Sequence, residues 1–270
     1  MRHGRLEGKV ALVVGGGSGM GRAGAVAMAT EGASVVVSDI ALDRAEAVAG
    51  SIASVGGKAV ALHVDVASSE LVQKLVAETV ARFGRIDALY HCAADVHFIN
   101  TRDARLTELD DDVWQRMIDI HLTGTFHVLK HVGRQMIAQR SGSIIVSSTV
   151  DALVGCAGLD SYTAAKGGVT SLVRSFAAGI GRDGVRVNAI APSFVSTESQ
   201  NIWLDDAGAR ATIDSLHILP IPTPEQIAPF VVYLASDESV AVTGTVVPID
   251  AGYMAFKANV DVMGTMQAGY

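Results

Sequence analysis

The chain has 270 residues, of which 49% are hydrophobic and 18% charged, so it can bury a large core. The formal net charge is −7 and no basic run occurs, which argues against nucleic-acid binding. The two cysteines, Cys92 and Cys156, are too few for a disulfide framework and lack metal-ligand spacing. No cleavable signal and no membrane-spanning apolar run is present. We therefore expect a cytoplasmic globular protein with no metal, membrane or nucleic-acid partner.

Short apolar segments alternate with longer amphipathic ones along the chain. The short segments are rich in β-branched residues and apolar on both faces, which predicts buried strands. These strands are Val10–Val14, Ser34–Ser38, Ala59–His63, Ala88–His91, Ile144–Ser147, Arg186–Ile190 and Val246–Ile249. Helices are expected at 20–31, 42–55, 68–83, 111–139, 161–182 and 224–236. The alternation predicts an α/β, Rossmann-type doubly wound fold, with a seven-stranded parallel sheet and helices on both faces.

No linker or repeat interrupts this pattern, so residues 1–270 are expected to form a single domain. The segment at about 193–223 breaks the rhythm and follows the sixth strand. Because ligands of such folds bind at the carboxyl ends of the strands, this segment is expected to be a substrate lid. The apolar tail at 254–270 continues beyond the last element, and we expect it to serve assembly or the lid.

A glycine-rich turn joins the first strand to the first helix. It reads Gly15-Gly16-Gly17-Ser18-Gly19-Met20-Gly21. Glycine permits a tight turn and lets the backbone approach a pyrophosphate, which then binds at the helix N-terminus. Asp39 follows at the end of the second strand, where an acidic side chain accepts hydrogen bonds from an adenosine ribose. An Asp at this place can also be only a helix cap, but the two signals together predict dinucleotide binding.

Asp39 also bears on which dinucleotide binds. Its carboxylate would repel a 2′-phosphate, and neither Ile40 nor Ala41 offers a positive charge. The sequence therefore predicts NAD rather than NADP.

Tyr162 and Lys166 lie four residues apart in an expected helix and so share one face. Nearby positive charge favours the phenolate, and Lys166 together with an oxidised nicotinamide would supply it. The phenolate can then exchange a proton with an alcohol or carbonyl. The pair alone can also be a surface pair of an amphipathic helix. The hydroxyls of Ser147, Ser148 and Thr149, at the end of the preceding strand, favour a catalytic role.

These residues and their order resemble the short-chain dehydrogenase/reductase superfamily, in its single-domain branch, along nearly the whole chain. The glycine turn, with Val14 in place of the family's threonine, and the Tyr-x3-Lys pair carry the resemblance. Further matches are Asp65, Pro192-Ser193 and the ending Asp250-Ala251-Gly252. The resemblance implies that Asp65 flanks the adenine and that Val195 and Thr197 contact the nicotinamide amide. It also implies a homotetramer.

The residue patterns and the resemblance together predict the following site. The expected catalytic residues are Tyr162, Lys166, Thr149, Ser148 and His121. The expected cofactor contacts are Gly15, Gly17, Ser18, Gly19, Met20, Gly21, Asp39, Ile40, Asp65, Val66, Cys92, Ala93, Ala94, Tyr162, Lys166, Pro192, Val195 and Thr197. The expected substrate contacts are Thr149, Asp151, Tyr162 and Trp203.

Three departures from the family pattern concern the site. His91-Cys92-Ala93-Ala94 replaces Asn-Asn-Ala-Gly, so the methyl of Ala94 calls for a local adjustment near the cofactor. Ungapped spacing places Thr149 at the family's catalytic serine, whereas a one-residue insertion would place Ser148 there. His121 replaces an asparagine that holds a water beside the lysine, and an imidazole with an ordinary pKa could also carry a proton. The other histidines, such as His131 and His217, are expected at the surface.

The expected activity is an NAD-dependent interconversion of a secondary alcohol and a ketone, with a small-molecule substrate. A cyclic or aromatic alcohol, a hydroxysteroid, a sugar or an acyl thioester all remain open as that substrate. The alternative is a dinucleotide-sensing protein whose catalysis has lapsed, which the retained Tyr162 and Lys166 argue against. A Rossmann-type methyltransferase is a weaker alternative.

Overall fold

A computed structural model describes residues 4–255. Seven parallel strands form one sheet in the order β3-β2-β1-β4-β5-β6-β7. The strands are β1 (Val10–Val14), β2 (Ser34–Asp39), β3 (Lys58–His63), β4 (Ala88–His91), β5 (Gly142–Ser147), β6 (Val185–Pro192) and β7 (Val246–Ile249). The chain order reverses between β1 and β4, which pair directly. The predicted Rossmann-type fold is confirmed.

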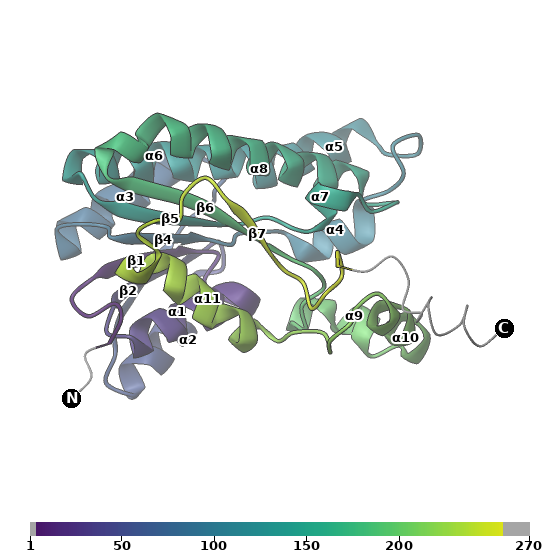
Figure 1. Cartoon of the computed structure of the whole chain (residues 1–270), viewed down its shortest axis with the longest axis horizontal. Helices are drawn as coiled ribbons and strands as arrows, with labels where there is room; N and C mark the ends of the chain where they lie inside the picture. Colours follow the sequence, from purple (N-terminus) through teal and green to yellow (C-terminus); the bar gives the residue numbers. More distant parts are fainter. Residues whose placement is uncertain (1–3, 256–270) are drawn as a thin grey trace, which may run out of the picture.

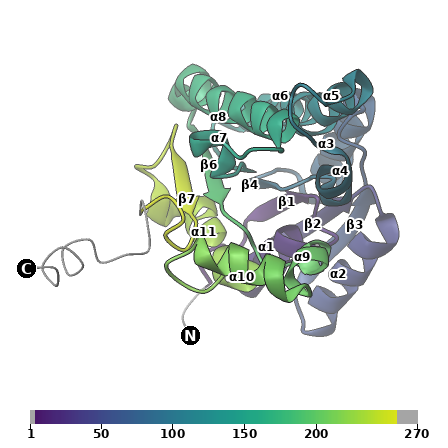
Figure 2. The ribbon, with the colours of Figure 1, turned by 90° about the vertical axis from the view of Figure 1, so that its right-hand side faces the viewer.

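Helices cover both faces of the sheet (Figure 1). The helices on one face are α3 (Ser69–Phe83), α6 (Gly124–Gln139) and α8 (Asp160–Ile180). Those on the other face are α1 (Gly19–Thr30), α2 (Leu42–Ser54) and α11 (Pro224–Ala235). The five remaining α-helices are α4 (Val96–Arg102), α5 (Asp111–Ile118), α7 (Asp151–Val154), α9 (Asn201–Leu204) and α10 (Ala207–Ser215). Four of them, α4, α7, α9 and α10, lie around the carboxyl ends of the strands, which Figure 2 views end-on.

Alternate residues of each central strand enter two separate cores. In β1, Leu12 and Val14 pack toward α6 and α8, whereas Ala11 and Val13 pack toward α1 and α11. Both sets are fully buried, since a strand between two helical layers has no solvent face. This double burial explains why the strands are continuous apolar runs in the sequence.

Local signals fix several helix ends as expected. The Ser68 hydroxyl accepts a hydrogen bond from the Leu71 amide at 3.3 Å and caps α3. Gly84 ends the same helix with a φ of 81°, a left-handed conformation that favours glycine. A serine cap and a terminal glycine thus set the two ends of α3.

The expected helix over 111–139 is confirmed, with one irregularity inside it. The structure has α5, then a π-helical turn at Asp119–Thr123, then α6. A π turn inserts one residue into the helical repeat and is frequent at functional sites. The segment 193–223 is also less irregular than expected, because it contains α9 and α10.

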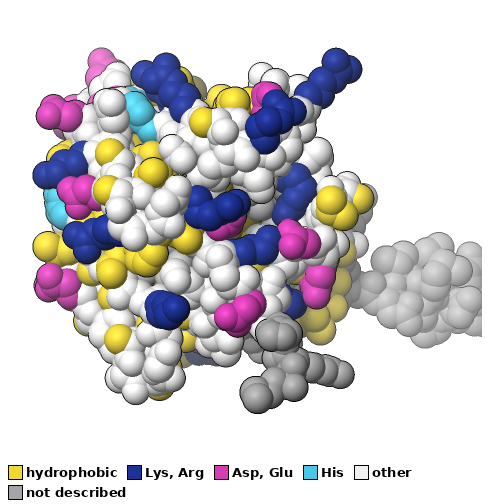
Figure 3. Space-filling view, turned by 90° about the vertical axis from the view of Figure 1, so that its left-hand side faces the viewer, with side chains coloured by type: hydrophobic (Ala, Val, Ile, Leu, Met, Phe, Trp, Pro, Cys, Tyr) yellow, Lys and Arg dark blue, Asp and Glu magenta, His cyan; other side chains and the backbone are white. Residues whose placement is uncertain are grey.

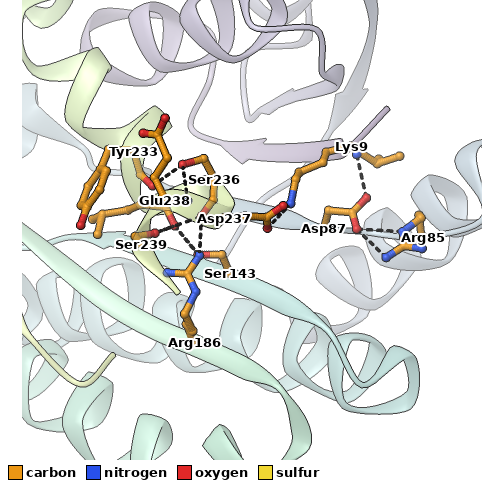
Figure 4. Close-up of polar contacts among 12 residues, drawn as sticks. Lys9, Arg85, Asp87, Ser143, Arg186, Tyr233, Ser236, Asp237, Glu238 and Ser239 are labelled. Atoms are coloured by element: carbon orange, nitrogen blue, oxygen red, sulfur yellow. Dashed lines mark hydrogen bonds and ion pairs between the residues drawn. The ribbon is translucent and has the colours of Figure 1, made fainter. Parts of the chain in front are cut away.

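A polar network closes the opposite end of the molecule, where the strands begin (Figure 4). Arg186 Nη2 donates to the carbonyls of Leu234 and Ser236, at 2.8 and 3.0 Å, and so stabilises the C-terminal end of α11. Lys9 pairs with Asp237 at 2.6 Å. Charges of both signs are mixed over this face (Figure 3). These contacts therefore stabilise the packing of α11 at the end of the sheet where the strands begin.

In residues 4–255 no helix is both long and apolar enough to cross a membrane. Most of the C-terminal tail lies outside the described residues, so its expected role stays a prediction.

Candidate active site

One cavity of about 970 Å³ opens at the carboxyl ends of the strands. It runs from the glycine turn past β2 and β3, and across β4 and β5 to the loop after β6. Most of the expected site residues line it. They are Gly15, Ser18, Gly19, Met20, Asp39, Ile40, Asp65, Val66, Cys92, Ala93, Ala94, Ser148, Thr149, Tyr162, Lys166, Pro192, Val195 and Thr197. Five expected residues do not line it: Gly17, Gly21, His121, Asp151 and Trp203.

The glycine turn is packed too closely for side chains. A Cβ at Gly17 would lie 2.9 Å from Asp39 Oδ2, and one at Gly21 would collide with the carbonyl of Gly15. The Gly17 amide instead donates to Asp39 Oδ2 at 2.9 Å. Ser18 precedes α1 but its side chain does not cap the helix, so the N-terminal amides of α1 keep their capacity to bind an anion. These features fit the pyrophosphate of a dinucleotide.

Asp39 and Arg44 bring opposite charges to the same end of the cavity. Asp39 Oδ1 accepts from the Ala41 amide at 3.0 Å, so the carboxylate is held in place without capping α2 through a side-chain bond. Arg44 lines the cavity, and its Cβ would lie 2.9 Å from a Cβ at Gly17. No ion pair engages Arg44 within the described residues. Arg44 lies in α2, beyond Ile40 and Ala41, so the two positions directly after Asp39 gave no sign of it.

The Tyr162 and Lys166 side chains meet as the helical spacing predicts. The Lys166 ammonium lies 5.8 Å from the centroid of the Tyr162 ring. It also donates to the carbonyl of Ser147 at 2.8 Å and is only 4% exposed. The carbonyl of Ser147, the last residue of β5, therefore holds the Lys166 ammonium near the Tyr162 ring.

Burial dominates the protonation of this pair. It raises the pKa of the Tyr162 phenol well above its usual range, and the negative charge of Asp151 raises it further. Burial also lowers the pKa of Lys166 to about 8. In the protein alone, the charge of Lys166 therefore does not suffice to favour the phenolate. Further positive charge, such as that of an oxidised nicotinamide, is needed.

The two hydroxyls of the Ser148–Thr149 alternative point to different partners. Ser148 Oγ donates to the carbonyl of Lys166 at 3.3 Å and is thus tied to the backbone of α8. Thr149 Oγ1 donates to Asp151 Oδ2 at 3.0 Å and accepts from the Asp151 amide at 3.2 Å. Thr149 therefore shares a local ring of hydrogen bonds with a carboxylate, whereas Ser148 supports the fold of α8.

His121 lies in the π turn, behind the cavity wall. Its Nδ1 donates to the carbonyl of Met117 at 3.0 Å, and its Nε2 accepts from the Asp95 amide at 3.4 Å. Its ring packs edge-on against Tyr162 at 5.5 Å between centroids. Burial, followed by the charge of Lys166, lowers the pKa of His121 to about 3. The expectation that His121 keeps an ordinary pKa is therefore wrong, and the ring is neutral at physiological pH.

The segment 193–223, the expected lid, is attached through a histidine that the sequence placed at the surface. His217 is 4% exposed, its Nδ1 donates to the carbonyl of Ile213 at 2.7 Å, and its Nε2 accepts from Ser193 Oγ at 2.9 Å. The ring of Tyr253 packs over it at 5.3 Å. His131 is also buried, so both surface predictions are wrong. No local pattern could reveal these contacts, because they join residues far apart in the chain.

Trp203 lies on α9 of the lid and is 38% exposed. It does not line the cavity, so the structure does not bring it to the other site residues.

Comparisons with known proteins agree on the family. A family model described as enoyl-(acyl carrier protein) reductase matches residues 15–254. The 3-oxoacyl-(acyl-carrier-protein) reductase of Thermotoga maritima is 34% identical over 92% of this chain and 98% of its own. The cis-4-hydroxycyclohexanecarboxylate dehydrogenase of Sinomonas cyclohexanicum is 38% identical over 92% and 97%.

A solved structure of a related enzyme has the same fold. The carveol dehydrogenase of Mycobacterium avium, solved in complex with NAD, superposes with a TM-score of 0.85 at 33% identity. The match covers 94% of this chain and all of that one. With the parallel sheet, the glycine turn and the Tyr162–Lys166 pair, these matches show that the chain belongs to the short-chain dehydrogenase/reductase superfamily of nicotinamide-dependent oxidoreductases.

Proposed function

We propose that this protein interconverts a secondary cyclic alcohol and its ketone with NAD(H). The observation that carries the proposal is the buried Tyr162–Lys166 pair, which faces a dinucleotide-sized cavity beside the Thr149 hydroxyl. The names of the cyclohexanecarboxylate and carveol dehydrogenases support a cyclic alcohol as the substrate. Both are similar to this chain over nearly its whole length.

The residues around the cavity fit a dinucleotide. The glycine turn would hold the pyrophosphate, Asp39 the adenosine ribose, and Asp65 would lie beside the adenine. Val195 and Thr197 would hold the nicotinamide amide, and Lys166 the adjoining ribose. Hydride acceptance and donation at the alcohol carbon are the chemistry that the bound dinucleotide supplies. The carboxylate of Asp39 supports NAD over NADP, because a 2′-phosphate would place like charges together.

The proton of the alcohol is handled by the protein. The Tyr162 phenolate would accept it during oxidation, and the phenol would return it during reduction. The charge of Lys166 supports the phenolate, and its position against Ser147 keeps the ammonium beside the ring. Thr149 would position the reacting oxygen. Neutral His121 would pack against the Tyr162 ring and support its position rather than carry a charge, since both of its ring nitrogens are bonded to the backbone.

A purified-protein assay tests this function. Cyclohexanol and carveol are offered with NAD or NADP at alkaline pH, and an acetoacetyl thioester with NADH or NADPH, while the reduced cofactor is followed by its absorbance. We expect oxidation of the cyclic alcohols with NAD. Turnover of the thioester alone would replace this function with an acyl reductase, and dinucleotide binding without any turnover would favour the sensor.

Substitution of Tyr162 by phenylalanine tests the catalytic assignment. We expect Tyr162→Phe to reduce kcat by roughly 10²–10⁴-fold, because the general acid/base is lost. The Kd for NAD should change by only a few-fold, since the glycine turn and Asp39 hold the dinucleotide. Substantial activity in this variant would contradict the proposed role.

A further inference from the structure

A short polar segment after β6, residues 197–200, forms part of the cavity wall, and we call it the strap. Three of its four residues, Thr197, Ser199 and Gln200, line the cavity. A Cβ added to Gly19 would lie 3.3 Å from the methyl carbon of Thr197. The strap therefore lies against the start of α1, where the glycine turn would hold a pyrophosphate.

Side chains from two separate helices hold the strap. Arg22, in the first turn of α1, pairs with Glu198 at 3.1 Å. Asn100, in α4, donates from Nδ2 to Gln200 Oε1 at 3.2 Å and to the carbonyl of Ser199 at 3.4 Å. The first residues of both helices also line the cavity. The strap thus connects α1 and α4 at the cavity through side-chain contacts.

These contacts are weak enough to break while the rest of the fold stays intact. The strap has no apolar side chain, and the buried apolar residues that flank it are Val195 and Leu204. The side chains of the Arg22–Glu198 pair are 43% and 61% exposed, and an exposed ion pair shifts an equilibrium by at most about 5-fold. A segment held by exposed polar contacts opens at a lower free energy than the packed elements around it.

We infer that the strap is a gate for the dinucleotide, and that Arg22 and Asn100 act as its two latches. The inference rests on the dinucleotide binding of the proposed function and is independent of which alcohol is oxidised. Both latches join protein atoms to protein atoms, so they can form with or without a bound dinucleotide. Entry and release then both require the latches to break.

This arrangement has a kinetic signature. Removal of a latch should speed entry and release together, so that the Kd for the dinucleotide changes much less than either rate constant. A side chain that bound the dinucleotide directly would behave differently, because its loss would raise koff and Kd together.

Stopped-flow fluorescence of NADH measures kon and koff for the wild type, Arg22→Ala, Glu198→Ala and Asn100→Ala. We expect each substitution to raise both rate constants about 2- to 5-fold, while Kd stays within about 2-fold. Arg22→Ala/Asn100→Ala should raise both about 5- to 20-fold, since the two latches share no partner. Arg82→Ala is the control, because it removes one side of an exposed ion pair with Glu78 on α3 and should leave both rates as they are.

Limited proteolysis gives a second measurement that needs no bound dinucleotide. A glutamyl endopeptidase should cleave after Glu198 sooner in Asn100→Ala than in the wild type, because the free strap opens more often. Cleavage at this site is followed by mass spectrometry, with Arg82→Ala again as the control.

The outcomes separate the gate from other roles of these residues. Unchanged rate constants in Arg22→Ala/Asn100→Ala would overturn the inference. So would a rise in koff and Kd without a rise in kon, because Arg22 or Asn100 would then bind the dinucleotide directly. A wild-type protein that binds neither NADH nor NAD would refute the proposed function, and the inference would fail with it.

Discussion

Two side chains of opposite charge, Asp39 and Arg44, line the cavity near the glycine turn, and we expect them to decide which dinucleotide is preferred. Asp39 is fixed by the amides of Gly17 and Ala41, whereas Arg44 has no ion pair within the described residues. In the wild-type protein the carboxylate would repel a 2′-phosphate. Once that repulsion is removed, we expect Arg44, which lines the same part of the cavity, to contribute attraction.

We therefore expect Asp39→Ser to raise kcat/KM with NADP by roughly 10- to 100-fold and to weaken the use of NAD. The double variant Asp39→Ser/Arg44→Ala should lose most of this gain. Both are measured as kcat/KM with the two cofactors on one alcohol. An NADP preference already present in the wild-type protein would contradict the predicted role of Asp39.

Matched substitutions distinguish Thr149 from Ser148 as the hydroxyl that positions the reacting oxygen. Thr149→Val should reduce kcat by roughly 10²-fold or more, because no hydroxyl would position the reacting oxygen. Thr149→Ser should stay within a few-fold of the wild type. Ser148→Ala should keep turnover but lose about 1 kcal/mol of unfolding free energy, since its bond to the Lys166 carbonyl is removed. Steady-state kinetics and urea unfolding distinguish the two, and the reverse pattern would assign Ser148.

At the scale of elements, hydrogen bonds to the loop after β6 and to the segment after β7 hold the expected lid, residues 193–223, in place. The His217–Ser193 bond joins the end of α10 to the loop after β6. The amides of Ile218 and Leu219 both donate to the carbonyl of Ala251, each at 3.0 Å. The segment after β7 therefore supports the lid from below, and disturbance of either contact should loosen α10.

We expect His217→Ala to raise the KM for the alcohol by about 5-fold with a smaller effect on kcat, as a net hydrogen bond and its packing are lost. Limited proteolysis should also cleave within α10 sooner. Ser193→Ala should act in the same direction, whereas Ser215→Ala, at the end of α10 and bonded only within it, serves as the control. Unchanged KM and proteolysis in both test variants would mean that the lid is held by other contacts.

The π turn is the second element that matters for the site. It brings His121 under Tyr162 while the helix continues into α6. Because the ring stays neutral above about pH 3, it cannot produce an acid limb in the pH–rate profile between about pH 5.5 and 10. We therefore expect the pH–rate profiles of the wild type and of His121→Asn to share the same acid side in this range.

At the scale of the whole molecule, buried neutral histidines make the fold sensitive to acid. His91 and His121 are 2% and 1% exposed, and burial lowers the pKa of each to about 3. In the unfolded chain a histidine titrates near ~6.5. Between these values only the unfolded chain binds the proton, so stability is lost as the pH falls from about 6.5 toward 3.

At pH 5 each of these histidines should cost about 2 kcal/mol of unfolding free energy relative to pH 7.5. His121→Asn should therefore lose about 2 kcal/mol less than the wild type over this interval. The control is His97→Asn, because His97 is exposed. Urea unfolding at the two pH values measures the difference, and equal losses in wild type and His121→Asn would show that His121 is protonated in the fold.

The expected homotetramer also belongs to this scale and stays a prediction. Light scattering of the full chain and of a chain that lacks 256–270 would test it, together with the role of the tail. We expect the truncated chain to lose mass or catalytic efficiency. Identical mass and kinetics would exclude a role for these residues.

The sequence by itself determined the fold and much of the cavity lining, because these depend on short-range patterns. Continuous apolar runs such as Val10–Val14 predict strands buried on both faces, and the glycine turn predicts a close backbone approach. The spacing of Tyr162 and Lys166 places both on one face of a helix. Each inference needs only the residues within one or two turns or strands.

Only the tertiary structure decided the partners and the protonation of the site. Thr149 bonds to Asp151, whereas Ser148 bonds to the carbonyl of Lys166. Arg44 lines the cavity together with Asp39, and His217 is buried against Ser193. The pKa of His121 likewise follows from the elements packed around it. Desolvation and Coulomb interactions depend on distances between segments remote in the chain, and a sequence pattern does not contain those distances.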